Sequence, residues 1–404
     1  MKKLLFSVAM LMASGMILAQ VSNVKEAKSL AGSDFQKAES LINEALINSE
    51  TKNDANTWNV AAMIQKNSGE EESKKAYLNQ PYDTAKAYNS VYKMFQYFLK
   101  CDELEQIPNE KGKVKFKFRN ANTEAMKIER PNLINGGIYY FNADNNKKAF
   151  DFFSMYVDAA TSKMLEKEDY INKDTLLTQI AYYAALAAAR NEDYKNVLKY
   201  TPLASNDKEV GKYALEFQSQ AYKALNDTAN WIATLKEGTQ KFPDYPFFFG
   251  HLVDYYANTG DFKDAMVFAD DMVSKNPTNP FFLYVKGYLY QNMKDYDNAI
   301  NFYKKTIEAD PNYAEAYSNL GLIYYQQGLD YANSITMEVS DPKFAGEQAK
   351  IKKFYEEARP YYEKARQLKP DQRDLWLNGL YSIYYKLNLG KEYEEIEKLM
   401  PSGN

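Results

Sequence analysis

The sequence contains little of the chemistry on which catalytic and metal centres depend. Of its 404 residues only one is cysteine, Cys101, and only one is histidine, His251. A single cysteine excludes an intramolecular disulfide and paired-cysteine motifs, and one histidine leaves little for a histidine-rich metal site or a Ser-His-Asp triad. We expect Cys101 to be a buried small apolar residue, and His251 to be a surface or packing residue.

Nucleotide-binding motifs are also absent. The chain has no P-loop, and no G-x-G-x-x-G follows a strand-like run. Acidic side chains are plentiful, but neighbours such as Asp270 and Asp271 are more typical of a solvated helix face than of paired catalytic carboxylates. The sequence therefore predicts a protein that is not an enzyme, with no catalytic residue, cofactor or bound metal.

Only one long hydrophobic run exists, and it lies at the start of the chain. Two lysines precede an apolar stretch over residues 4–18, and Ala19 is a small residue suited to cleavage before Gln20. This arrangement predicts a signal peptide over residues 1–19, the alternative being a retained membrane anchor. We expect an exported bacterial protein with no membrane span in its mature form, periplasmic by default and otherwise extracellular or surface-associated.

The chain has no excess of positive charge. It carries 50 Lys and Arg residues against 54 Asp and Glu residues, a formal net charge of −4. Binding to a phosphate backbone needs clustered cations, so we expect no nucleic-acid partner.

A regular spacing of proline and alanine is the strongest positive signal. Pro243, Pro277 and Pro311 lie 34 residues apart, as do Ala265 and Ala299. A fixed period of this size indicates stacked repeats, each a single supersecondary unit. Proline has no backbone N–H and clashes inside a helix, so each of these prolines marks a helix end.

The residues within each period predict two antiparallel helices that cross closely. Small residues, Gly287 and Ala299, suit the crossing, and Tyr290 and Tyr303 suit the spaces between helices. The segment from Ala314 to Tyr325 (AEAYSNLGLIYY) resembles the tetratricopeptide repeat, although Lys286 stands where that repeat usually has leucine. The resemblance implies an all-α fold, an α-solenoid of stacked antiparallel helix pairs forming a superhelix.

The resemblance varies along the chain and suggests the following organisation. We expect a helical N-terminal region with weak repeat character at 20–104, an irregular basic insertion at 105–128, divergent repeats at 129–244, well-matched repeats at 245–328, an insertion at 329–353, and a C-terminal repeat with capping helices at 354–404.

One segment alternates in the manner of a β-strand. Between Lys113 and Arg119 the cations occupy every second position, and Val114, Phe116 and Phe118 would share the opposite face. The pattern predicts a short β-segment near 113–119. It could add to the sheet of a partner, or its aromatic face could cover a helix pair while the cations keep it soluble.

The family resemblance also implies a ligand-binding surface. In tetratricopeptide repeats the first helix of each pair lines a concave groove, and an Asn at the place of Asn319 often binds a peptide backbone through an amide that donates and accepts. Phe281 and Tyr284 could instead pack against neighbouring helices. The groove positions carried onto this chain are Phe247, Asp254, Asn258, Phe281, Tyr284, Tyr288, Gln291, Asn292, Asn319, Tyr325 and Gln326.

These residues are rich in aromatic rings and amides and poor in cations. We therefore expect a non-catalytic scaffold or adaptor of the bacterial cell envelope, which binds a protein or peptide segment in its groove. The alternative is a glycan-binding component of a surface nutrient-uptake system, because sugar rings also stack on tyrosine.

Overall fold

The computed structural model describes residues 21–338 and 340–400, and every regular element in these ranges is a helix. The predicted signal peptide, 1–19, lies outside the described residues. No helix in the described ranges combines the length and the apolar character needed to cross a bilayer. The chain divides between Phe242 and Pro243 into two compact units.

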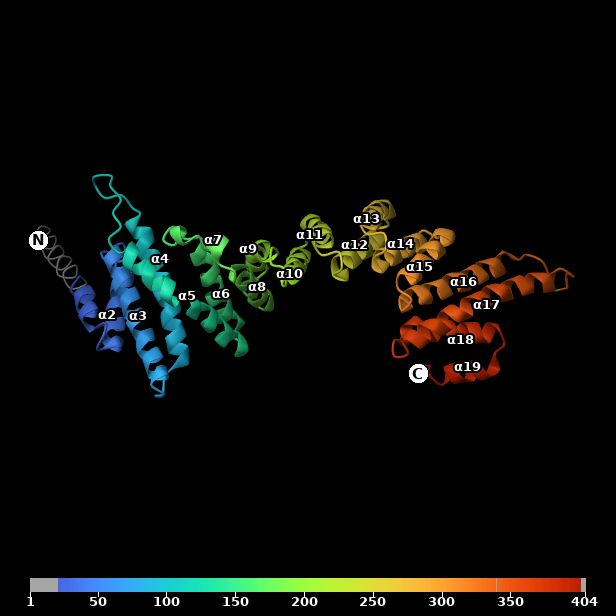
Figure 1. Ribbon diagram of the computed structural model, residues 1–404, viewed down its shortest axis with the longest axis horizontal. Coiled ribbons are helices and arrows are strands. Elements are labelled where there is room, and N and C mark those ends of the chain that lie inside the picture. The colour runs from blue at the N-terminus through green and yellow to red at the C-terminus, as the bar shows by residue number, and fades with distance from the viewer. Residues whose placement is uncertain (1–20, 339, 401–404) are drawn as a thin grey trace, which may run out of the picture. The chain divides into compact units, whose positions relative to one another are not determined.

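The first unit is a succession of antiparallel helices (Figure 1). After a helical stretch at 21–30 come α2 (Phe35–Ile47), α3 (Ala55–Tyr77), α4 (Thr84–Glu105), α5 (Arg119–Asn142), α6 (Asn146–Ala160), a 3-10 turn (Glu166–Glu168), α7 (Tyr170–Lys173), α8 (Leu177–Arg190), α9 (Tyr194–Ala204), α10 (Gly211–Ala224) and α11 (Thr228–Lys241).

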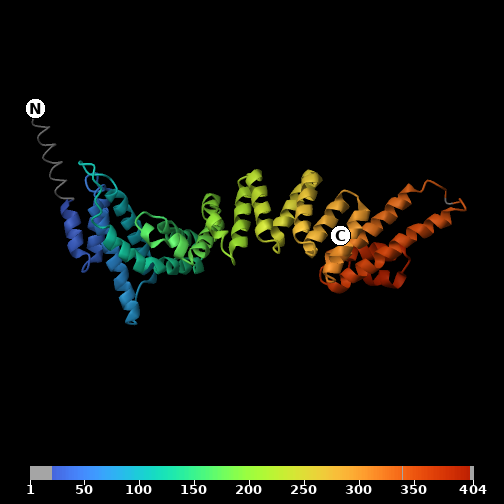
Figure 2. The ribbon, with the colours of Figure 1, turned by 45° about the horizontal axis from the view of Figure 1, so that its top comes forward.

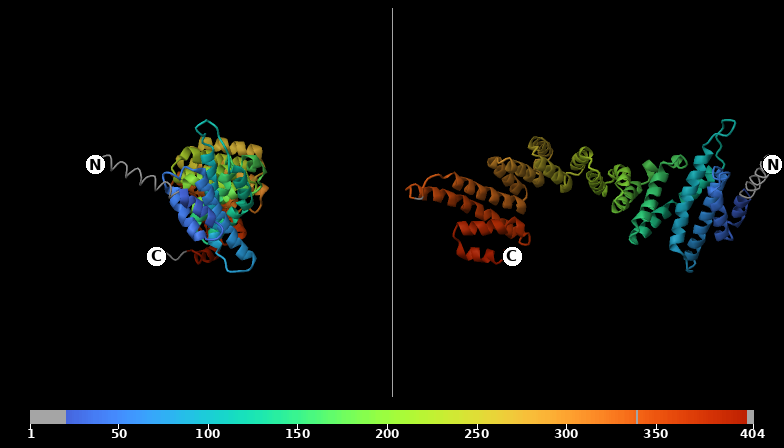
Figure 3. Two further views of the ribbon diagram at one scale, coloured as in Figure 1. Left: turned by 90° about the vertical axis from the view of Figure 1, so that its left-hand side faces the viewer. Right: turned by 180° about the vertical axis from the view of Figure 1, so that it is seen from behind.

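The second unit continues with helix pairs. It comprises α12 (Pro246–Thr259), α13 (Phe262–Lys275), α14 (Pro280–Asn292), α15 (Tyr296–Ala309), α16 (Ala314–Ser334), α17 (Phe344–Leu368), a 3-10 turn (Arg373–Leu375), α18 (Leu377–Lys386) and α19 (Gly390–Glu397). Figure 2 shows α16 and α17 as a long hairpin, and the view from behind in Figure 3 shows α18 beside it. The all-α fold and the stacked helix pairs predicted from the sequence are confirmed.

The turns within the pairs α12–α13 and α14–α15 have the same local structure. A residue with positive φ is followed by a side chain that caps the next helix: Gly260 (φ 74°) precedes Asp261, and Lys294 (φ 60°) precedes Asp295. The Asp295 carboxylate accepts the backbone N–H of Asn298, which satisfies one of the unpaired donors at the start of α15. The 34-residue period therefore repeats both a chain reversal and a helix start.

The crossings of α5 with α6, α14 with α15 and α16 with α17 each place a glycine against an aromatic ring. A Cβ atom at Gly287 would lie 2.8 Å from the ring of Tyr303, and one at Gly321 would lie 2.7 Å from the ring of Tyr362. Gly137 faces Phe153 in the same way in the first unit. Glycine is needed at these positions because the ring of the second helix occupies the space of a side chain on the first.

The prediction of a β-segment near 113–119 is wrong. Residues 113–116 form neither helix nor strand, and α5 begins at Arg119, inside the range expected to be irregular. A strand needs a partner strand, and none exists among the described residues. The alternative reading, in which the apolar face covers a helix pair, also fails for Val114 and Phe116, which are 44% and 45% exposed.

The segment at 329–353 does not form a surface loop. Its residues lengthen α16 to Ser334 and begin α17 at Phe344, so only the short connection between them is irregular. Tyr355 is buried against this longer hairpin, where a Cβ at Gly328 would lie 2.7 Å from its ring. The additional residues therefore extend a helix pair and bury apolar surface.

Candidate functional site

Four of the predicted groove residues line one hollow between α14 and α16. Tyr288, Gln291 and Asn292 come from the second half of α14, and Gln326 comes from α16. The hollow has a volume of about 400 Å³, and its remaining lining residues are Lys294, Tyr296, Leu322, Ile323 and Asp330. The helical period brings these residues together because positions three and four apart share a face.

The lining is polar, with one charge of each sign from Lys294 and Asp330. The Gln326 amide donates to the Asp330 carboxylate at 2.8 Å, and the Asn292 amide donates to the backbone carbonyl of Tyr288 at 2.8 Å. The pKa of Tyr296 is raised, chiefly by burial and then by the Asp330 charge. The hollow therefore offers amides and tyrosines whose positions are already restrained.

A chain of hydrogen bonds lies next to the hollow. The Tyr303 hydroxyl donates to Gln291 Oε1 at 2.7 Å, and Asn319 Nδ2 donates to the hydroxyls of Tyr303 at 3.0 Å and Tyr284 at 3.1 Å. Burial raises the pKa of Tyr284 to about 12 and raises that of Tyr303 further. Both phenols are therefore neutral donors and acceptors at physiological pH.

This network gives Asn319 and Tyr284 internal roles. The two amide protons of Asn319 are directed at tyrosine hydroxyls, so they hold the first helices together from within. Tyr284 packs against Tyr303 and Tyr313, with ring centroids 5.6 Å and 5.0 Å apart. The network fixes Gln291, and through it one wall of the hollow.

The other predicted groove residues lie apart from the hollow. Phe281 packs on Phe249, and Tyr325 packs on Tyr355. Phe247 makes an edge contact with His251, at 4.4 Å between ring centroids. Asp254 and Asn258 are exposed on α12.

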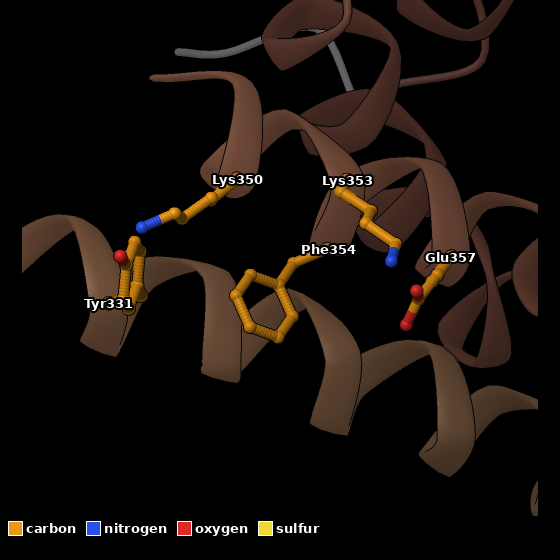
Figure 4. Close-up of a pocket in the computed structure, with 5 residues that line it drawn as sticks. All are labelled: Tyr331, Lys350, Lys353, Phe354 and Glu357. Carbon is orange, nitrogen blue, oxygen red and sulfur yellow. The ribbon is translucent and has the colours of Figure 1, made fainter. Parts of the chain in front are cut away.

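A second hollow lies between α16 and α17, in the part of the chain that the sequence indicated as an insertion (Figure 4). It has a volume of about 250 Å³, and its lining residues are Tyr331, Lys350, Lys353, Phe354 and Glu357. The rings of Tyr331 and Phe354 lie 6.0 Å apart, and the Tyr331 hydroxyl bonds to Glu347. The sequence does not predict this site, because the repeat pattern resumes only at Phe354, whereas α17 begins at Phe344.

The single cysteine, Cys101, and the single histidine, His251, both pack against other side chains. Cys101 is fully buried in α4, and burial raises its thiol pKa to about 12. No cluster of three or more His, Cys, Asp or Glu suited to a metal ion exists within residues 21–338 and 340–400.

Known proteins share the repeat signature. Residues 287–328, which include the C-terminal part of α14, all of α15 and α16 as far as Gly328, match the family model described as "TPR repeat". The photosystem I assembly protein Ycf3 of Acaryochloris marina is 23% identical over 158 residues, which cover 38% of this chain and 86% of that protein.

Parts of this chain also resemble solved structures of repeat proteins. A TPR repeats protein from Bacteroides fragilis is 18% identical, with a TM-score of 0.33 over 67% of this chain and 99% of that one. The C-terminal part of a TPR repeat-containing protein from Cytophaga hutchinsonii is 17% identical, with a TM-score of 0.40 over 65% and 92% of the two chains. Residues 287–328 of this chain therefore form a tetratricopeptide repeat, which has Gly287 at its helix crossing.

Proposed function

We propose that this protein is a non-catalytic scaffold that binds an extended segment of a partner protein in the hollow between α14 and α16. The observation that carries the proposal is the convergence of Tyr288, Gln291, Asn292 and Gln326 on one 400 Å³ space. Amides suit a peptide because they can donate to a carbonyl and accept from an N–H. A volume of this size lies in the range of known binding clefts.

The restrained geometry of the hollow supports the same function. Gln291 is held by the hydroxyl of Tyr303, a residue with no exposed surface. A side chain that is already fixed loses little conformational entropy when a ligand binds. The lining carries one Lys and one Asp, so the hollow would select a peptide of balanced charge rather than a strongly acidic one.

The cellular setting is part of the proposal. The basic start, apolar run and small residue over 1–19 favour export and a role in the bacterial cell envelope. The Acaryochloris relative is named as an assembly protein, a role of the same general kind as a scaffold.

The proposal is tested with the full-length mature chain and two arrays, one of unstructured peptides and one of oligosaccharides. Peptides that bind the wild type are titrated against Tyr288→Ala and Gln326→Ala. Each change should weaken binding about tenfold or more, as expected for loss of an anchoring contact. Tyr385→Ala, at an exposed position on α18 outside the hollow, is the matched control and should bind as the wild type does.

Two results would contradict the proposal. Peptides that bind both groove variants undiminished would show that the site lies elsewhere. Binding to oligosaccharides with no peptide enriched would favour the glycan alternative.

A further inference from the structure

The loop between α4 and α5 exposes an unusual combination of side chains. Figures 1 and 3 show it extending beyond the ends of the two helices. Lys111, Lys113, Lys115 and Lys117 are all exposed, and the structure records no ion pair for them. Val114 and Phe116 lie between these cations and are about half exposed. The loop therefore presents apolar and cationic side chains together.

Buried carboxylates hold the end of this loop. Glu105, which is 7% exposed, accepts the backbone N–H of Lys117 at 2.5 Å and that of Phe118 at 3.0 Å. Asp102, which is 4% exposed, binds the Arg119 guanidinium at 2.5 Å and 2.9 Å. Burying a carboxylate is costly unless it is well paired. Both carboxylates therefore order the loop where it enters α5.

The remaining contacts orient the segment further. Arg119 lies over the ring of Phe116 at 3.4 Å, which covers one face of that ring. At the other end, Lys113 donates its N–H to the Asn109 side chain at 3.1 Å, and its carbonyl accepts the Asn109 N–H at 3.0 Å. The stretch between these two anchors is short and has little freedom.

The anchors leave one edge of the backbone unpaired. Within the described residues, no hydrogen bond is recorded for the backbone groups of Val114, Lys115 or Phe116. In an extended chain, alternate residues direct their N–H and C=O groups to the same side. Lys113 and Lys117 already bond to Asn109 and Glu105, so the backbone groups of Val114 and Phe116 are the ones free to pair with another strand.

We propose that residues 113–117 bind the open edge of a β-sheet in an acidic partner protein, as an added strand. The unpaired backbone groups of Val114 and Phe116 form the hydrogen bonds to the partner strand. The flanking lysines favour a partner with acidic side chains next to that strand. A membrane is a poorer occupant because unpaired backbone groups are costly in hydrocarbon. A second copy of the same loop is disfavoured by repulsion between like charges.

The test uses the full-length chain and a defined probe. The probe is a disulfide-closed β-hairpin peptide with one free edge, whose exposed face alternates Thr and Glu. A second version carries N-methyl groups on the free-edge amides, which prevents pairing but keeps every charge. Binding is measured by fluorescence anisotropy at low and at physiological salt, with vesicles of anionic phospholipid as a separate arm.

If the loop binds through backbone hydrogen bonds, two substitutions of Val114 should have different effects on binding. Val114→Pro removes an N–H from the free edge while remaining compatible with an extended chain, and it should weaken hairpin binding about tenfold or more. Val114→Thr keeps the N–H and should bind within about twofold of the wild type. The N-methylated hairpin should bind the wild-type protein as weakly as the unmodified hairpin binds the proline variant.

Three outcomes would overturn the proposal. The wild type could show no binding to the hairpin. It could bind both hairpins, or both Val114 variants, equally, which would indicate charge attraction alone. It could also bind the vesicles in preference to the hairpin, which would indicate a membrane surface.

Discussion

Replacement of Gly287 by alanine tests the helix-crossing geometry of the matched repeat. A Cβ there would lie 2.8 Å from two ring atoms of Tyr303, closer than folded proteins allow. The ring cannot step aside easily, because it is fully buried and its hydroxyl is held between Asn319 and Gln291. Either the helices must separate or the hydrogen-bond chain must break.

Two opposing contributions set the change in the free energy of unfolding caused by Gly287→Ala. Overpacking of a core typically costs about 1–3 kcal/mol, whereas replacing glycine by alanine inside a helix contributes about 1 kcal/mol of stability. Gly287→Ala should therefore reduce the free energy of unfolding by up to about 2 kcal/mol. Gly287→Leu should reduce it further, since the larger side chain adds more atoms to the same space.

Gly250 provides a matched control in the same unit. It lies inside α12, and no atom comes within 4 Å of a Cβ built there. Gly250→Ala should therefore raise the stability by about 0.5–1 kcal/mol. Both variants are measured by urea unfolding followed through helical circular dichroism, and by amide exchange in α14 and α15. Equal stabilisation by the two alanines would refute the proposed crossing.

Two further predictions concern titrating groups in the first unit. Glu72 is 3% exposed, and its pKa is lowered from 4.5 to about 2, first by the N–H of Asp83 and then by Lys86 and Lys75. Its contribution to stability should be complete above pH 4.5 and lost as the pH falls toward 2. In the Glu72→Gln variant, the urea midpoint should therefore change less with pH over that window. A variant with the same pH dependence as the wild type would contradict the lowered pKa of Glu72. Burial raises the pKa of Cys101 to about 12, so a thiol reagent at pH 8 should label it only in denaturant. Rapid labelling of the native protein would show that α4 is not packed as described.

The repeat could be predicted because its positions carry the same physical demand each time. In the repeats that contain α13 and α15, the proline after the second helix, the small residue at the crossing and the Asp at the start of the second helix are local requirements. The sequence alone therefore predicts Gly287 at the crossing and Tyr303 in the space between the helices. The groove positions on the first helices were implied by the family resemblance, and four of them, Tyr288, Gln291, Asn292 and Gln326, line one hollow.

In the loop before α5, the local sequence pattern predicts a strand that does not form. Alternating lysines and apolar residues satisfy the period of a strand, but a strand forms only when a second strand supplies its hydrogen bonds. Here Glu105 takes the available N–H groups at one end and Asn109 takes those at the other. No local signal in the sequence pairs these residues.

The sequence by itself determined the helical class, the repeat length and the face of each first helix, because period, capping and small-residue spacing act over a few residues. The tertiary structure alone decided which polar groups are already satisfied. Asn319 occupies a predicted ligand position, yet its amide protons are directed at Tyr284 and Tyr303. The tertiary structure likewise decided that residues 329–353 lengthen α16 and α17. Such outcomes depend on partners far apart in the chain, whose competition for hydrogen bonds and buried space is settled only when the helices pack.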